Sequence, residues 1–200
     1  NKMPALTYLD LSHLQLSQTC YEWVTEGCNN LETLILNHCE NLDDRALVKI
    51  GSKCLVLKKL VCNQCLKLTD AGIVGFFEGM TKGVELGLCG PYGGLKYFDI
   101  SSNIDCKEAS VLALAKYEST VQRYYPNQGL ICLKMNGLSY VTAVALMAMW
   151  KACTDLAYFE MKLELSQTVT HRKSMMPHIS DSILIQARYH LLQGANLSGC

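Results

Sequence analysis

LETLILNHCENLDD, residues 31–44, decides the fold, because it returns 26 positions later as LKKLVCNQCLKLTD, residues 57–70. Both copies carry apolar residues at positions 1, 4, 6, 9 and 12, and both end on aspartate at position 14. Self-similarity at a fixed period of about 20–50 residues is the signature of a repeat protein whose units stack side by side. Such a stack has no natural catalytic pocket and offers a long surface that suits a macromolecular partner.

The first nine positions of the unit follow the pattern L-x-x-L-x-L-x-x-(N/C/L). Apolar residues that alternate with others form one buried face of a strand, so each copy predicts a strand with its intervening side chains turned outward. The intervals between copies are 25, 26, 38, 35, 26 and 36 residues, so three of them carry roughly ten extra residues. The copies begin at Leu6, Leu31, Leu57, Leu95, Leu130, Leu156 and Leu192.

Each strand leads through a turn into a predicted helix. Asp44 and Asp70 stand where a short acceptor side chain can cap the free amides of a first helical turn. Further helices are expected over residues 109–116 and 141–152. The extra residues of the long intervals are interpreted as loops, which either contribute to binding or are tolerated surface insertions. These segments are residues 79–94, 117–129 and 166–178.

The pattern therefore predicts a right-handed α/β solenoid, with a curved parallel sheet inside and helices outside. We expect one domain over residues 1–200, with about six to seven repeats. Because the sequence begins at Asn1 and stops at Cys200 inside a copy of the unit, we expect it to be part of a longer protein.

Composition excludes several classes of partner. Lys plus Arg and Asp plus Glu both number 18, and no basic cluster is present, so we expect no nucleic-acid binding. The longest apolar run, residues 143–150, is far shorter than the about 20 residues that a membrane span requires. Most of the 11 cysteines sit beside leucines at repeated positions, which predicts buried free thiols and a reducing compartment. The expected location is the cytoplasm, with the nucleus and the cytoskeleton as alternatives.

Residues 54–73 carry a more specific pattern: Cys54-x-x-Leu57-x-x-Leu60-x-Cys62-x-x-Cys65-x-x-Leu68-Thr69-Asp70-x-Gly72-Ile73. This stretch resembles the cysteine-containing class of leucine-rich repeats, and residues 28–47 resemble the same unit. The class is typical of F-box/leucine-rich-repeat proteins, the substrate receptors of cullin-type ubiquitin ligases. The resemblance implies a protein partner on the sheet and a ligase adaptor bound by a segment outside this sequence. Similar repeats occur in axonemal and other scaffold proteins.

Candidate chemistry elsewhere in the chain is better explained by packing. Cys62-x-x-Cys65 lacks a second ligand pair for zinc, and both members occupy inward positions of the unit. His13 and His38 occupy the eighth position of successive units, where we expect them to be neighbours beside an inert, buried Cys39. We therefore expect no catalytic residues, no metal site and no cofactor, and hence no enzyme.

The outward strand positions are the candidate binding residues, because they mix tyrosines with both signs of charge and small polar groups. The alternative is that they are ordinary solvated residues of an open sheet. The function expected is non-catalytic protein recognition, as the substrate-binding part of an F-box-type ligase receptor, with a structural scaffold subunit of a cytoskeletal or axonemal assembly as the alternative. The candidates are Tyr8, Asp10, Ser12, Thr33, Ile35, Asn37, Lys59, Val61, Asn63, Tyr97, Asp99, Ser101, Cys132, Lys134, Asn136, Tyr158, Glu160 and Lys162.

Overall fold

Six short parallel strands form one sheet in the computed structural model, which describes residues 3–138 and 140–161. The strands are paired in chain order, so each crossover connects nearest neighbours. The predicted seventh copy of the unit, from Leu192, and the predicted loop at residues 166–178 lie outside the described residues. The strands are β1 Tyr8–Asp10, β2 Thr33–Ile35, β3 Lys59–Val61, β4 Tyr97–Asp99, β5 Cys132–Lys134 and β6 Tyr158–Glu160.

The pairing register confirms the sequence intervals. Paired residues of successive strands are 25, 26, 38, 35 and 26 positions apart, as the repeated leucines predict. Each strand is therefore the same part of the same unit, and the chain is an α/β solenoid. We call the five complete units, which begin at Leu6, Leu31, Leu57, Leu95 and Leu130, coils one to five.

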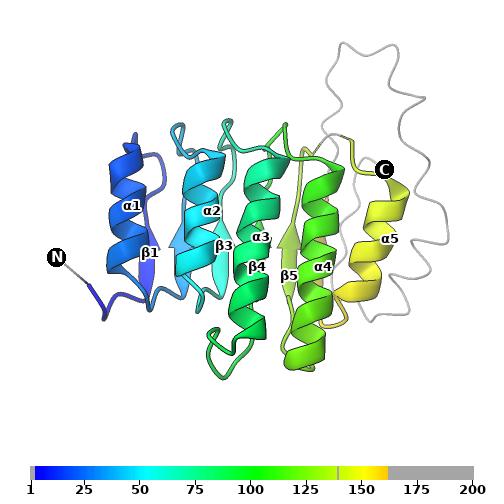
Figure 1. Ribbon diagram of the computed structural model, residues 1–200. Helices are drawn as coiled ribbons and strands as arrows, with labels where there is room; N and C mark the ends of the chain where they lie inside the picture. Colours follow the sequence, from blue (N-terminus) through cyan, green and yellow to red (C-terminus); the bar gives the residue numbers. More distant parts are fainter. Residues whose placement is uncertain (1–2, 139, 162–200) are drawn as a thin grey trace, which may run out of the picture.

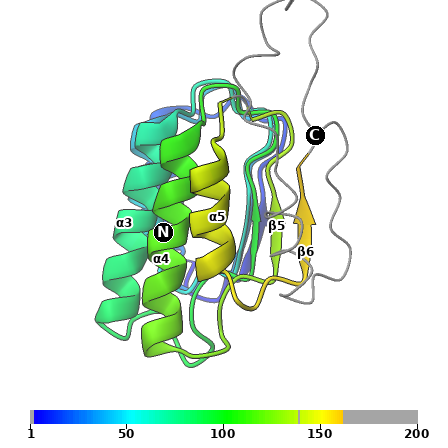
Figure 2. The ribbon, with the colours of Figure 1, turned by 90° about the vertical axis from the view of Figure 1, so that its right-hand side faces the viewer.

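The helices lie in a row over one face of the sheet (Figure 1), and the side view places α3, α4 and α5 on one side with β5 and β6 on the other (Figure 2). No helix among the described residues is long and apolar enough to cross a membrane. The helices are α1 Gln18–Gly27, α2 Asp44–Lys53, α3 Asp70–Glu85, α4 Glu108–Tyr124 and α5 Ala143–Ala152.

The core lies between the helices and the sheet. The central residues of the five inner and C-terminal strands, Leu34, Leu60, Phe98, Leu133 and Phe159, are at most 1% exposed, because alternation turns them toward the helices. In the first coil Leu6, Leu9 and Leu11 are only partly buried, since β1 is the edge strand and is paired with a strand on one side only. Leu14, expected to point inward, is 46% exposed.

Cysteines fill the remaining core positions, as predicted. Of the ten cysteines in the described residues, eight are buried and all ten are unpaired. The ninth position of the unit also reaches back to the preceding coil: the Cys65 thiol donates to the Leu36 carbonyl at 3.0 Å, and the Asn103 amide donates to the Cys62 carbonyl at 2.7 Å. The Cys-x-x-Cys pair thus serves packing, and the core interpretation is confirmed.

Two predicted loops begin as helix. Residues 79–85 extend α3 and residues 117–124 extend α4, so the glycine-rich composition was a misleading signal for the first part of segment 79–94. Residues 86–94 and 125–129 lie outside helices and strands, as predicted. At Gly79 an added Cβ would lie 2.7 Å from backbone atoms of Gly51 on α2. Glycine is used there for close helix packing, at a local cost of about 1 kcal/mol in helix propensity. The prediction of α5 over residues 141–152 is confirmed to within two residues.

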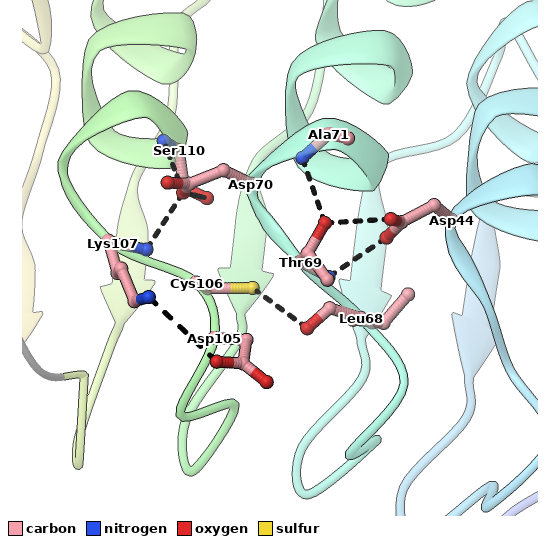
Figure 3. A network of polar contacts seen from close by, with 9 residues as sticks. All are labelled: Asp44, Leu68, Thr69, Asp70, Ala71, Asp105, Cys106, Lys107 and Ser110. Carbon is pink, nitrogen blue, oxygen red and sulfur yellow. Dashed lines mark hydrogen bonds and ion pairs between the residues drawn. The ribbon is translucent and has the colours of Figure 1, made fainter.

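The aspartate at position 14 has a different role from the predicted cap. Asp43, not Asp44, caps α2 by accepting from the Ala46 amide at 2.9 Å. Asp44 accepts instead from the Thr69 amide at 2.8 Å and from the Thr69 hydroxyl at 2.7 Å, and Thr69 itself caps α3 (Figure 3). The carboxylate therefore ties one coil to the cap of the next.

The next coil repeats this contact between the acidic residue at position 14 of one coil and the start of the helix in the following coil, and we call each such contact a bracket. Asp70 accepts from the amides of Lys107 and Ser110, at 2.8 and 3.0 Å, and from the Ser110 hydroxyl (Figure 3). Helix α4 has no side-chain cap of its own, so the preceding coil supplies its acceptor. Glu108, at the same position of the unit, accepts from the hydroxyl of Thr142, the cap of α5, at 2.6 Å.

Candidate functional site

The face of the sheet opposite the helices carries the predicted binding residues, and we call it the open face (Figure 2). The first and third residues of each strand project onto it, because alternate side chains point to opposite faces. The register aligns them in two rows across the sheet. The first row is Tyr8, Thr33, Lys59, Tyr97, Cys132 and Tyr158, and the second is Asp10, Ile35, Val61, Asp99, Lys134 and Glu160.

Exposure decreases from the N-terminal edge toward the middle of the open face. Tyr8 is 56% exposed and Asp10 is also exposed. Most other candidates are half-buried, and Lys162 lies outside the described residues. The half-buried candidates are Ser12, Thr33, Ile35, Asn37, Lys59, Asn63, Tyr97, Cys132, Lys134, Asn136, Tyr158 and Glu160.

Three candidates are buried, so the expectation that every outward position faces solvent was wrong. Val61, Asp99 and Ser101 are only 6%, 5% and 8% exposed. Val61 and Asp99 belong to the central strands β3 and β4, each of which is paired with a strand on both sides. These three residues are part of the floor of the open face, and a partner would reach them only through the side chains around them.

A hydrogen-bond network explains the burial of the two polar residues. The amide and hydroxyl of Ser101 donate to the Asp99 carboxylate at 3.1 and 2.7 Å. The Asn63 side chain donates to the other carboxylate oxygen at 3.2 Å, and the Asn136 amide donates to the Ser101 hydroxyl at 3.1 Å. Asp99 thus joins coils three, four and five, and buried polar groups with partners of this kind stabilise a single arrangement.

The same aspartate–serine arrangement recurs on the exposed edge strand β1. Ser12 donates to the Asp10 carboxylate through its amide at 2.9 Å and through its hydroxyl at 2.6 Å. The Ser12 hydroxyl and amide hydrogen bonds lower the pKa of Asp10, so this carboxylate is charged and solvated on the open face.

Lysines and tyrosines alternate along the C-terminal half of the open face. The Lys59 ammonium lies 4.6 Å from the ring centre of Tyr97, and the Lys134 ammonium lies 5.4 Å from that of Tyr158. Lys134 also pairs with Glu160 at 3.4 Å. Burial, together with the nearby Asp99 carboxylate, raises the pKa of the Tyr97 phenol. The phenols are therefore neutral hydrogen-bonding groups held in place by cations, which is the amphipathic character that interface tyrosines need.

One edge of the open face is a row of turns at the eighth position of the unit. His13, His38, Gln64, Ser102 and Gly137 all have positive φ, between 54° and 69°. The amides of the first four donate to a carbonyl of the next coil at 2.6–3.0 Å, so the strained backbone is held by the ladder. The rings of His13 and His38 stack with their centroids 4.5 Å apart, which confirms that they are neighbours.

The described residues offer little nucleophilic or metal-binding chemistry. No group of three or more His, Cys, Asp or Glu side chains among them is placed to hold a metal ion. Burial raises the pKa of the Cys65 thiol to about 12 and that of Cys62 well above its ordinary value, so the Cys-x-x-Cys pair is a poor source of thiolate.

Sequence reasoning missed the brackets at position 14. The signal was present, because an acidic residue recurs there as Asp44, Asp70 and Glu108, and each has a hydroxyl or amide partner one coil later. A local cap explains one such residue equally well, so the two roles were indistinguishable before the coils were placed side by side. The brackets matter for the open face because they fix the spacing of the coils that compose it.

Comparison with known proteins identifies the architecture. A tropomodulin C-terminal domain from Caenorhabditis elegans has a similar structure, with a TM-score of 0.55 and 11% identity over 88% of this chain and 91% of that chain. A chain of the yeast Rad7–Elc1 complex gives a TM-score of 0.43 and 19% identity over 78% of this chain and 43% of that one. No protein-family model and no curated protein sequence matches this chain. The tropomodulin likeness is one of fold and agrees with an α/β solenoid.

Proposed function

We propose that the chain is a non-catalytic recognition module that binds a protein partner on its open face. The observation that carries this proposal is the arrangement of the sheet: helices cover one face, and the other presents lysines that contact tyrosines of the next strand. Tyrosine is enriched at binding hot spots, and charges of both signs steer and select a partner.

The finer proposal is that the module is the substrate-binding part of an F-box-type ubiquitin ligase receptor. Its support is the cysteine-containing repeat, whose buried Cys62 and Cys65 fulfil the role that the resemblance implies. The ten unpaired cysteines of the described residues suit a reducing compartment, so the proposed location is the cytoplasm or nucleus. The near-balance of charges on the open face argues against nucleic acid as the partner.

A paired set of variants tests recognition on the open face. The open-face variant, Thr33→Arg with Lys59→Glu, places a bulky cation and a reversed charge on β2 and β3. The matched helix-face variant, Val48→Arg with Lys49→Glu, makes the same changes at exposed positions of α2. Partners captured by the tagged chain are identified by mass spectrometry, and affinity is then measured with the purified partner.

The proposal predicts that the open-face variant weakens binding at least about tenfold, which corresponds to about 1.4 kcal/mol, while the helix-face variant changes it less than about twofold. The reverse pattern would contradict binding on the open face. Capture of a cullin and its adaptor by the longer protein would support the ligase role. A protein that resists extraction from a cytoskeletal assembly and captures no ligase would support the scaffold alternative instead.

A further inference from the structure

The C-terminal half of α4 carries two adjacent buried polar side chains that hold the loops on either side of it. The Tyr117 hydroxyl accepts from the Leu95 amide at 2.8 Å, at the start of coil four. A Glu118 carboxyl oxygen accepts from the Leu130 amide at 2.9 Å, at the start of coil five. Both side chains are 0% exposed. Helix α4 thus holds in place the two chain segments that lead into β4 and into β5.

Gly129 lies directly against the Glu118 side chain, where a larger residue would not fit. A Cβ added at Gly129 would lie 2.6 Å from the Glu118 carboxyl oxygen and 2.5 Å from the side-chain nitrogen of Gln122. The second carboxyl oxygen of Glu118 is buried and has no hydrogen-bond partner among the described residues. A buried carboxylate in that position would leave a charged oxygen without a donor, which is far more costly than a neutral acid.

Further charged groups converge on the same short segment, residues 128–130. Asp155 accepts from the Gly129 amide and from the Gln122 side chain, both at 2.7 Å. The Lys96 ammonium donates to the carbonyl and the side-chain oxygen of Gln128, the latter at 3.3 Å. Segment 128–130 is therefore held by Lys96 of coil four and by Asp155 of the turn before β6.

Burial of Glu118 disfavours the charged form of its carboxyl group. Burial raises its pKa to about 8; the Leu130 amide and Lys96 oppose this rise, and Asp155 adds to it. Burial lowers the pKa of Lys96, against the attraction of the two carboxyl groups. The titratable groups that face Glu118 from the surrounding elements are Lys96, Tyr117, Cys153 and Asp155, with Cys89 beyond Tyr117 and Lys96.

We propose that Glu118 is a proton-operated latch: its neutral form holds segment 128–130 against α4, and loss of its proton releases this segment and loosens the start of β5. The latch joins coils four and five, so its release acts on the C-terminal half of the open face, where Lys134 and Tyr158 lie. This inference concerns regulation of the fold and does not depend on which partner binds.

The sign of the pH dependence follows from the two states of the chain. An unfolded Glu titrates near its ordinary value of 4.5, whereas the folded value is about 8. The latch therefore contributes fully below pH 4.5, and its contribution is lost progressively as the pH rises through about 8. Between these values the unfolded state binds about one proton fewer than the folded state, which favours unfolding by about tenfold per pH unit.

The test compares the wild-type 200-residue chain with the E118Q variant by urea unfolding between pH 5.5 and 7.5. Glutamine keeps the acceptor for the Leu130 amide but cannot ionise. The ratio of the wild-type to the E118Q unfolding constant should rise by about a hundredfold over this range, which follows from linkage of one proton. Contributions from the five histidines cancel in the ratio. The matched control E78Q, at an exposed position of α3, should give a constant ratio.

A ratio that stays constant for E118Q would overturn the proposal. If E118Q does not fold, the carboxyl carbon of Glu118 is titrated by NMR in the wild-type chain. A midpoint near 8, accompanied by loss of amide protection at Leu130, supports the latch. A midpoint near 4.5, or a high midpoint with unchanged protection at Leu130, contradicts it.

Discussion

The short coils (one, two and five) and the long coils (three and four) connect to the following coil in different ways, although their strands are identical in length. Coils one, two and five each carry a ten-residue helix whose C-cap is a cysteine: Cys28, Cys54 or Cys153. Coils three and four carry helices of 16 and 17 residues whose C-caps are Leu86 and Tyr125. The extra length descends below the short helices at the lower edge of the molecule (Figure 1).

The difference appears at one backbone amide, that of the leucine that begins the next coil. After a short coil this amide donates to the carbonyl of the closing cysteine, as Leu57 does to Cys54 at 3.1 Å. After a long coil a side chain of α4 accepts from this amide instead: Tyr117 for Leu95 and Glu118 for Leu130. Short coils therefore close on backbone alone, whereas long coils depend on particular buried side chains. Four substitutions test this difference.

The largest expected effect is at Gly94, inside a long-coil loop. A Cβ there would lie 1.9 Å from the Tyr117 hydroxyl. G94A should therefore displace the phenol and cost about 3 kcal/mol in chemical denaturation, from overpacking together with a lost buried hydrogen bond. The control is G90A in the same loop, where no atom lies within 4 Å and only the positive φ of 75° is strained. It should cost about 1 kcal/mol; equal losses would contradict the closure role of Tyr117.

The bracket between the two long coils comes next. D70A removes the acceptor for two amides and a hydroxyl at the start of α4, so we expect a loss of about 2 kcal/mol in the free energy of unfolding. The control D105A removes an exposed carboxylate whose ion pair with Lys107 spans 3.9 Å, and it should cost less than about 0.5 kcal/mol. A D70A loss as small as that of D105A would show that α4 is capped without its neighbour.

Y117F isolates the hydrogen bond from the packing. It leaves the ring in place and removes the acceptor for the Leu95 amide, so the free energy of unfolding should fall by about 1–2 kcal/mol. Hydrogen exchange should locate the loss at Leu95. The control Y124F, with a half-exposed ring on the same helix, should be neutral in both measurements.

The smallest expected effect is at the closing cysteine of a short coil. C54A removes a buried thiol but leaves the carbonyl that accepts from Leu57, so the loss should be about 1 kcal/mol from packing alone. Hydrogen exchange at the Leu57 amide should change only as much as global unfolding of the chain does. Selective loss of protection there would mean that short coils also depend on a side chain.

The sequence predicted the strands well, because their period-two pattern reports burial directly and does not depend on what lies between them. Leu34, Leu60 and Phe98 occupy equivalent places despite intervals of 26 and 38 residues. The helices of the long coils were predicted, but their C-terminal extensions, residues 79–85 and 117–124, were interpreted as loops. In the first extension, glycine was interpreted as a helix breaker. At Gly79 it serves instead to bring α3 against α2, and only the packed structure distinguishes these two uses.

The sequence predicted which face of the sheet the candidate residues lie on, but it did not predict how exposed they are. Alternation placed Asp99 and Ser101 on the open face, yet their burial depends on Asn63 and Asn136 from other coils. Glu118 was missed altogether, since residues 117–129 were interpreted as a loop, in which an acidic residue suggests a solvated position. Its burial follows from the path of the chain through Gly129, which no local pattern specifies.

Photo-crosslinking tests the central claim, binding on the open face, most directly. p-Benzoylphenylalanine is placed either at Tyr97, on the open face, or at Leu112, which is 41% exposed on α4. Irradiation with the captured partner should give a crosslinked product from position 97 and none from position 112. A product from position 112 alone would place the partner on the helices and contradict the account.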